Sequence, residues 1–318
     1  MSTATSPGAI GRLKAAADTR PLAVVWLATV IFSTGPVMVA TMSNDGVVIA
    51  FWRMWAGVPV LGLLATFQIR ASGRRPTRRG WRLAAVAGIV FALHQIALME
   101  SLRRTTVVDV TLMNTLAPVV VAVLAVPMFG ERPGVQFRLW SLVAMAGAAA
   151  VAVVGSSGPG GQPLGMSLAA ANVVAYSAYF VMSKQARQDI DTWPFLFGAL
   201  GTATLLVTAF GLTIHAPVAD ISLHDLALCI AIAVLPGAVG HGAMTWALRY
   251  VPANIPPVIM LLIPLLAGVL AWLIAGQTVK LVTIAGGIIT VAGVLGAVRS
   301  PAAQSLSAVE SLDLAEST

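Results

Sequence analysis

Few side chains in the apolar stretches of this sequence could carry chemistry, and two histidines are among them. His94, which Gln95 follows, lies near the middle of one apolar stretch, and His241 lies in another. Histidine titrates near neutral pH and can therefore relay a proton. It also forms hydrogen bonds between packed helices, which would be a structural role. Both interpretations are open for each histidine, and both residues are candidates for proton coupling.

Two charged residues in these stretches have similarly open roles. Arg53 lies several residues inside an apolar stretch, where a charge is costly and therefore often functional. It could contact an anion or form part of a gate, or its guanidinium could reach the membrane interface as a structural group. Glu100, near the end of the stretch that contains His94, could bind a proton or a cationic solute, or it could pair with Arg103 or Arg104.

One apolar stretch carries a polar and aromatic stripe with helical spacing. Asn172, Tyr176 and Tyr179 lie four and three residues apart and are followed by Ser183, so one helix face would carry all of them. An asparagine that faced lipid would be unsatisfied at considerable cost. The stripe should therefore face a wet pathway or form hydrogen bonds to another helix. A smaller stripe in the first apolar stretch consists of Trp26, Thr29, Ser33 and Pro36.

Prolines mark two further stretches at related positions. Asn114 and Pro118 share a helix face in one stretch, and Met260 and Pro264 share a face in a later one. A proline can free backbone carbonyls toward a cavity, or it can be a packing kink. The residues that we expect to line a pathway are Trp26, Ser33, Arg53, His94, Gln95, Asn114, Pro118, Asn172, Tyr176, Tyr179, His241, Trp246, Met260 and Pro264.

The composition indicates which elements must position these side chains. The chain has 318 residues, of which 58% are hydrophobic and only 10% are charged, and its mean hydropathy is +0.89. Soluble domains carry about 25% charged residues, so the sequence predicts an all-α fold whose surface faces lipid. Ten stretches are long enough to span a membrane as helices. They cover residues 21–42, 47–69, 82–102, 105–127, 137–154, 164–183, 193–214, 224–247, 252–275 and 281–298.

The basic residues predict the orientation of these spans. If the N-terminus is cytoplasmic, all but four of the 19 Lys and Arg residues fall on the cytoplasmic side, including the arginine cluster of residues 70–82. Positive residues concentrate on that side of membrane proteins, so we expect both termini in the cytoplasm. We interpret the arginine cluster as an anchor on anionic lipid rather than a nucleic-acid site. Residues 1–20 and 300–318 should be cytoplasmic tails, the second of them disordered.

An internal repeat relates the two halves of the chain, residues 21–155 and 164–299. A shift of 146 residues places Leu102-Arg103 on Leu248-Arg249, Leu116-x-Pro118 on Leu262-x-Pro264, and Ala146-Gly147 on Ala292-Gly293. Each half holds five predicted spans, an odd number, so the second half must be inverted relative to the first. Inverted repeats recur in secondary transporters, where the two halves exchange conformations and give alternating access.

These features resemble the drug/metabolite transporter superfamily, and within it the EamA type. The motifs are Ala50-Phe51-Trp52-Arg53 in the second span, Leu116-Ala117-Pro118-Val119 and Phe129-Gly130-Glu131-Arg132 in the fourth, and Leu261-Leu262-Ile263-Pro264 and Ala275-Gly276-Gln277 in the ninth. Gln277 stands where this family often has glutamate. The resemblance implies a central cavity lined by spans 1, 3, 4, 6, 8 and 9, with spans 5 and 10 as packing elements.

The sequence therefore predicts an integral protein of the cytoplasmic membrane that exports a small metabolite, amino acid or drug-like solute by alternating access. Its partners would be the solute, the bilayer and, as a coupling ion, protons that His94, Glu100 or His241 could bind; it would be a monomer or homodimer. We expect no cofactor and no metal, because the sequence has no phosphate-binding loop and no Cys/His cluster. An uncoupled channel and an intramembrane enzyme are the alternatives, and no recognisable pair of nucleophile and base supports the enzyme.

Overall fold

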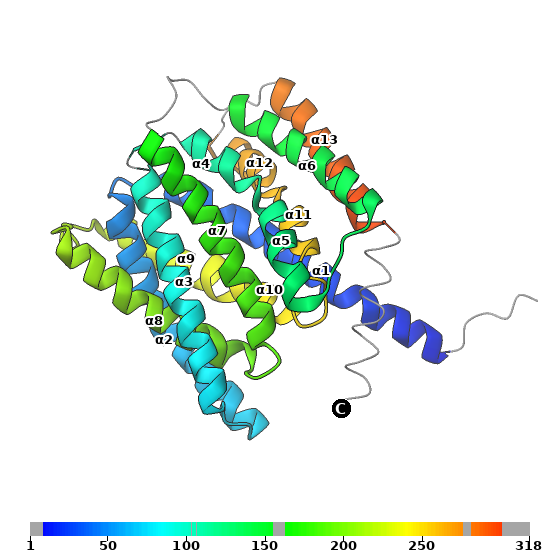
Figure 1. Cartoon of the computed structure of the whole chain (residues 1–318). Coiled ribbons are helices and arrows are strands. Elements are labelled where there is room, and N and C mark those ends of the chain that lie inside the picture. The colour runs from blue at the N-terminus through cyan, green and yellow to red at the C-terminus, as the bar shows by residue number, and fades with distance from the viewer. Residues whose placement is uncertain (1–8, 103, 106, 155–162, 276–280, 301–318) are drawn as a thin grey trace, which may run out of the picture.

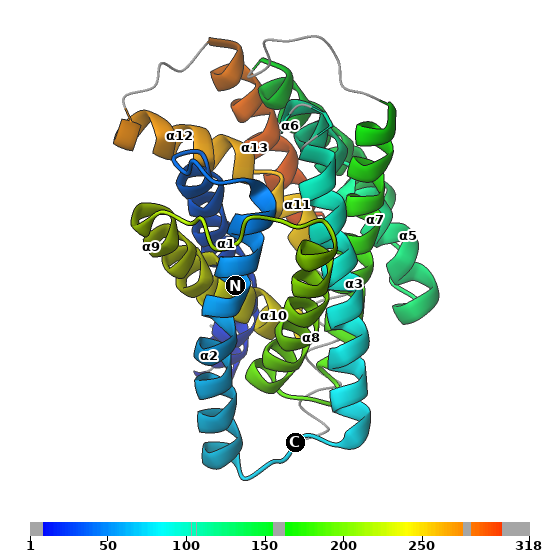
Figure 2. The same ribbon diagram turned by 90° about the vertical axis from the view of Figure 1, so that its left-hand side faces the viewer.

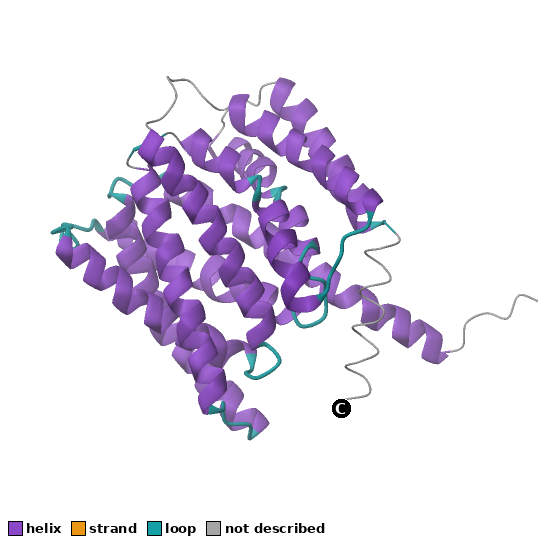
Figure 3. Cartoon of the chain, in the orientation of Figure 1, coloured by secondary structure: helices purple, strands orange, loops and turns teal. Residues whose placement is uncertain are grey.

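The computed structural model describes residues 9–102, 104–105, 107–154, 163–275 and 281–300, and these residues form helices and short connections (Figure 1, Figure 3). The first half contains α1 (Ala9–Val39), α2 (Gly46–Ser72), α3 (Arg78–Leu102), α4 (Val107–Asn114), α5 (Ala117–Phe129) and α6 (Val135–Val154). The second half contains α7 (Pro163–Ala186), α8 (Thr192–Thr213), α9 (Leu223–Ile232), η1 (Ala233–Gly240), α10 (His241–Ala247), α11 (Ile255–Met260), α12 (Ile263–Ala275) and α13 (Leu281–Val298). Helices suit a lipid environment because they satisfy every backbone polar group internally.

The described helices have the length and composition of membrane spans. Seven of them are long and apolar enough to cross a bilayer. Three shorter apolar helices, Val135–Val151, Ile255–Leu270 and Ile284–Val298, lie where the fifth, ninth and tenth spans are predicted. The all-helical membrane fold is therefore confirmed, while the number of ten spans stays a prediction.

Three of the predicted spans are interrupted helices. The fourth span is divided into α4 and α5 at residues 115–116, and the ninth is divided into α11 and α12 at residues 261–262. Pro118 and Pro264 then lie in the first turn of α5 and α12, where backbone N–H groups have no partner within the helix. The eighth span contains the π-helical segment η1 around Pro236. The two breaks are 146 residues apart, which is the register of the repeat.

The ends of the chain differ in part from the predicted tails. Helix α1 begins at Ala9 rather than at residue 21, because the stretch from Leu13 to Ala17 is rich in residues that favour helix. Residues 301–318, and with them nearly all of the predicted C-terminal tail, lie outside the described residues. Gln277 and Arg103 lie outside them as well.

The helices of the two halves pack against one another rather than forming separate bundles (Figure 2). α3 packs along α7 and α8, α2 along α8, and α6 along α13, while α1 lies against η1, α10 and α12. Two buried apolar clusters result. One joins α1, α5 and α6 to α7 and α10–α13, and the other joins α2 and α3 to α7, α8 and η1.

Glycines allow α6 and α13 to approach each other closely. A Cβ atom added to Gly147 would meet the backbone nitrogen of Thr290 at 2.5 Å, and one added to Gly293 would overlap the backbone of Ala144. Small residues at helix contacts are a common basis of packing in membranes. The close approach of α6 and α13 agrees with the packing role that the resemblance implies for spans 5 and 10.

Candidate functional site

A cavity of about 370 Å³ lies between helices of both halves, and we call it the central cavity. Its wall is mostly apolar and comes from α1, α3, α4, α5, α6, α7, α11 and α12. Five of the predicted pathway residues lie on it: His94, Asn114, Tyr176, Met260 and Pro264. The predicted spans 1, 3, 4, 6 and 9 therefore contribute to this cavity. Span 5 adds one residue that was not expected, Ala148, whereas span 8 contributes to a different space.

Asn172 lies behind this wall and holds one of its residues. The Asn172 amide nitrogen donates a hydrogen bond to the Asn114 side-chain oxygen at 3.1 Å, which joins α7 to α4. Asn172 is only 1% exposed, and its own side-chain oxygen has no hydrogen-bond partner among the described residues. Of the two interpretations of this asparagine, hydrogen bonding between helices is therefore the one that the geometry supports.

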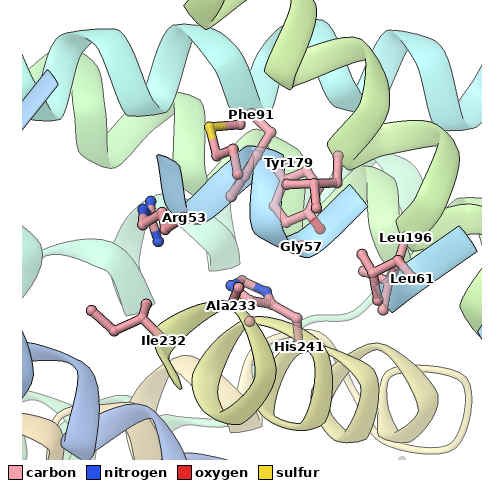
Figure 4. Close-up of a pocket in the computed structure, with 12 residues that line it drawn as sticks. Arg53, Gly57, Leu61, Phe91, Tyr179, Leu196, Ile232, Ala233 and His241 are labelled. Atoms are coloured by element: carbon pink, nitrogen blue, oxygen red, sulfur yellow. The ribbon is translucent and has the colours of Figure 1, made fainter. Parts of the chain in front are cut away.

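A smaller cavity of about 50 Å³ lies between α2, α8 and η1, and we call it the arginine chamber (Figure 4). Its volume has room for about four water molecules. Arg53 on α2 and His241 at the start of α10 line it from facing sides, and Tyr179 on α7 lines it as well. Helix α2 begins at Gly46, so Arg53 lies about 10 Å along the span at 1.5 Å per residue.

An aromatic cluster separates the two cavities. The rings of Phe91 and Tyr179 lie 4.7 Å apart, those of His94 and Tyr176 lie 4.9 Å apart, and Phe91 also contacts His94 at 5.4 Å and His241 at 5.9 Å. His94 and Tyr176 face the central cavity, whereas Phe91, Tyr179 and His241 face the arginine chamber. The two histidines that the sequence singles out thus lie on opposite sides of one layer of rings.

Arg53 carries a charge that the described part of the protein does not neutralise. None of the ion pairs among the described residues involves its guanidinium, and no hydrogen bond of this group occurs there. A charged side chain at the centre of a membrane helix costs about 2.5–3.5 kcal/mol on insertion scales. An unpaired arginine that faces an internal cavity is therefore a site at which an anion would be stabilised.

A buried ion pair joins the two halves at the end of the molecule that carries the arginine cluster, and we call it the ionic latch. The Lys184 Nζ lies 2.8 Å from the Glu131 Oε1, and both side chains are less than 10% exposed. The Glu131 Oε2 accepts the backbone N–H of Ala253 at 2.7 Å, and Lys184 donates to the Val251 carbonyl at 2.9 Å. The Phe129 ring lies 5.4 Å below the ammonium group. The latch therefore connects the α5–α6 turn to α7 and to the α10–α11 turn.

This latch was not predicted from the sequence. The predicted sixth span ends at residue 183 and leaves Lys184 in a connection, whereas α7 continues to Ala186 and the lysine is buried. The sequence did contain a signal for this pairing, because the Gly130-Glu131 motif and Lys184 both follow spans that end on the predicted cytoplasmic side of the membrane. Close by, burial lowers the pKa of the Arg187 guanidinium to about 10, Arg249 acts in the same direction, and Asp191 opposes both.

Comparison with known proteins decides the family. The model of the EamA-like transporter family matches the chain twice, over residues 20–153 and 163–299. The chain belongs to the EamA-like transporter family. An uncharacterized transporter of Archaeoglobus fulgidus is 28% identical over 273 residues, which cover 86% of this chain and 94% of the relative. A protein of solved crystal structure shares the fold with a TM-score of 0.74 at 16% identity, covering 88% of this chain and 97% of that one.

Three predicted pathway residues of this EamA-like transporter are packed away from both cavities. Ser33 is fully buried and its hydroxyl donates to the Val30 carbonyl of its own helix at 2.6 Å. Gln95 is 3% exposed and faces neither cavity, and Trp26 packs against a buried apolar cluster. A helix can satisfy a serine hydroxyl internally, so a polar residue in a span does not by itself indicate a pathway.

Two more predicted pathway residues of the transporter line neither of the two cavities. Pro118 lines a groove between α5 and α6 instead of the central cavity. Trp246 is 36% exposed, and its ring lies 4.9 Å from that of Tyr250. Trp246 is five residues from His241, which rotates it by about 140° around a helix, so the two side chains cannot face one cavity.

Glu100 pairs with Arg104, which is the structural alternative that the sequence left open. Its carboxylate forms an ion pair with Arg104, one helical turn later, and the Arg104 guanidinium also donates to the Glu100 carbonyl at 3.1 Å. The pair lies where α3 ends, and Glu100 lines neither cavity. A role of Glu100 in proton binding has no support in this arrangement.

Proposed function

We propose that this EamA-like transporter is a secondary transporter of the cytoplasmic membrane, acting as a monomer or homodimer, that exports a small metabolite, amino acid or drug-like solute by alternating access. The observation that carries the proposal is the central cavity of about 370 Å³, which lies between the two halves and is bounded by interrupted helices of both. Its volume falls within the range of small-molecule sites, about 300–1,000 Å³. Interrupted helices at a repeat interface are a feature of transporter binding sites.

Alternating access needs halves that can exchange conformations, and two pairs of contacts support this property. The contact of Gly147 with Thr290 becomes that of Gly293 with Ala144 when each residue is moved by 146 positions to the other half, and both contacts exist.

The second pair of contacts lies at opposite ends of the molecule. The Asp225 carboxylate accepts the backbone N–H of Ser43 at 2.9 Å. The 146-residue shift relates Ser43 to Asp189 and Asp225 to Arg79, and Asp189 and Arg79 form an ion pair at 3.5 Å. Equivalent positions thus meet at both ends, as inverted halves require.

The ionic latch has no such equivalent in the sequence. The positions equivalent to Glu131 and Lys184 in the other half, 146 residues away, are Gln277 and Met38, and neither is charged. A charge pair therefore favours closure of only one end. The Arg79–Asp189 pair links the first turn of α3 to the α7–α8 connection, which directly follows Lys184 and the end of α7. The latch therefore lies at the end of the molecule that carries the arginine cluster. We propose that this end is cytoplasmic, with both termini on that side, and that the latch holds a state closed to the cytoplasm.

Reconstitution tests the proposed function. The purified protein is placed in liposomes, and efflux of a panel of amino acids and amphipathic metabolites is measured with and without an imposed pH gradient. Proton coupling through the histidines predicts that His94→Ala or His241→Ala abolishes the gradient-driven part of the flux. Flux that is the same with and without the pH gradient would support the alternative of an uncoupled facilitator. Unchanged gradient-driven flux in both variants would reject coupling through histidine. No protein-dependent flux for any solute would contradict transport.

A further inference from the structure

Arg53 is the one permanently charged side chain among the described residues that line the central cavity or the arginine chamber. The buried carboxylates that could have balanced its charge are engaged elsewhere. Glu131 binds Lys184 and the backbone of Ala253. Asp225 accepts hydrogen bonds from the backbone N–H groups of Ser43 and Asn44, both at 2.9 Å. The anion that suits Arg53 must therefore come from outside the described part of the chain.

The arginine chamber defines the chemistry of this anion. One guanidinium balances one negative charge, and its planar fork matches the two oxygens of a carboxylate. The chamber has room for about four water molecules, so it accepts a carboxylate group but not a whole metabolite. Its other lining side chains are apolar except for Tyr179 and His241, which could donate a hydrogen bond to the same anion.

The rest of the solute would lie against rings. Phe91 and Tyr179 form the wall of the arginine chamber toward the central cavity, and their rings contact each other at 4.7 Å. His94 and Tyr176 continue this aromatic layer on the side of the central cavity. Rings in such a layer favour contact with apolar and aromatic groups. A solute with its charged end in the arginine chamber and its body against this layer would have one polar end and one apolar end.

We propose that Arg53 binds the carboxylate of the transported solute, and that the solute class is a carboxylate with an apolar or aromatic body. This assignment rests on the proposed transport function, because it places the solute in the interior cavities. The repeat provides no second site of this kind, since the position 146 residues after Arg53 is Ala199. The positive charge that binds the carboxylate would therefore come from the first half alone.

A set of three probes with one carbon skeleton tests the assignment. 3-Phenylpropionate, 3-phenylpropanol and 3-phenylpropylamine differ only in carrying an anionic, a neutral or a cationic end. Their binding to the detergent-purified protein is measured as thermal stabilisation over a range of ligand concentrations, which yields a dissociation constant without requiring transport. The variants are Arg53→Gln and Arg53→Lys, and Arg138→Gln, an arginine on the outer groove, is the matched control.

The expected result is a preference of about 30-fold for the carboxylate over the alcohol in the unmodified protein, equivalent to about 2 kcal/mol. Arg53→Gln should reduce this preference to less than about threefold, and Arg53→Lys should keep about tenfold, because lysine retains the charge but not the fork. Arg138→Gln should leave the preference unchanged. Alcohol or amine binding as tightly as the carboxylate would overturn the assignment, as would an unchanged preference in a folded Arg53→Gln protein.

Two further measurements separate this inference from the proposed function. Stabilisation by chloride alone, with no gain from 3-phenylpropionate, would show an inorganic anion at Arg53 and overturn the solute assignment. Flux of the three probes is also measured in liposomes. Transport of the alcohol or amine but not of the carboxylate would leave the proposed function intact and reject the carboxylate class. Carboxylate flux that Arg53→Gln abolishes and Arg138→Gln does not would support both.

Discussion

Neutralising Glu131 tests whether the ionic latch holds one end of the transporter closed. Glu131→Gln keeps the size of the side chain but removes the charge that faces Lys184 at 2.8 Å. The lysine remains in place with 5% exposure, and its ammonium group keeps its hydrogen bond to the Val251 carbonyl and its contact with the Phe129 ring. The substitution also introduces at this turn the residue that the sequence carries at the equivalent position 277.

The expected magnitude follows from the burial of the pair. Removing one partner of a buried ion pair costs about 3–5 kcal/mol, because the other charge is left uncompensated. The contacts that Lys184 keeps favour the lower end of this range. A loss of about 3 kcal/mol in the closed state changes the ratio of closed to open protein by about 100-fold. The effect should therefore be visible even if relaxation offsets half of it.

Cysteine accessibility measures this ratio. The chain contains a single cysteine, the buried Cys229, which is first replaced by alanine. A new cysteine is then placed at Ala267 on the wall of the central cavity, and a membrane-impermeant maleimide is added from either side of sealed vesicles. Glu131→Gln should increase the labelling rate at least about tenfold from the side of the arginine cluster and should decrease it from the opposite side.

Two variants serve as controls for this experiment. Glu131→Gln combined with Lys184→Met removes both charges, so closure should be partly restored, since no buried charge is then left without its partner. Glu100→Gln disrupts the ion pair with Arg104 outside the latch and should leave labelling unchanged. If Glu131→Gln does not alter the labelling of a folded protein from either side, the latch does not set the conformational equilibrium and our interpretation of it is wrong.

Two further predictions concern packing, and thermal unfolding in detergent measures both. Gly293→Val should destabilise the protein by about 1–3 kcal/mol, because its side chain would overlap the backbone of Ala144. Gly268→Val should have little effect, because a Cβ atom added there would meet no neighbouring element within 4 Å. Equal effects of the two substitutions would refute the close approach of α6 and α13. Asn114→Ala should cost about 1 kcal/mol through the lost hydrogen bond from Asn172, and a change of less than about 0.3 kcal/mol would show that this bond is not stabilising.

Sequence patterns predicted the helices well because a lipid-facing span must be both long and apolar, and few soluble elements share these properties. They did not predict that the fourth and ninth spans are interrupted, although Pro118 and Pro264 lie two residues after the two breaks and mark their positions. The positions of side chains around a span were less predictable. The Ser33 hydroxyl donates its hydrogen bond to a carbonyl of its own helix. Trp246 is exposed and does not line the arginine chamber, although His241, in the same predicted span, does.

The ionic latch shows a second limit of prediction from sequence. Lys184 and Glu131 lie 53 residues apart at the ends of different spans, and each alone resembles an ordinary interfacial charge. Only the packing of α7 against the α5–α6 turn removes both from water and brings them to 2.8 Å. A topology with both groups on one side is compatible with their pairing but does not require it. Long-range pairs of this kind depend on tertiary structure.

The repeat and the charges together explain how one scaffold could favour one direction. The contacts of Gly147 with Thr290 and of Gly293 with Ala144 exchange between the halves under the 146-residue shift, so under the proposed alternating access they would contribute about equally to the two end states. The charges do not exchange, because Glu131, Lys184 and Arg53 correspond to Gln277, Met38 and Ala199. Any difference in energy between a state closed at one end and a state closed at the other would then come mainly from such positions, which have no charged equivalent in the other half. A solute anion at Arg53 would act on this difference only if the two states hold it unequally, which makes Arg53 and the latch the residues at which binding and conformation can be coupled.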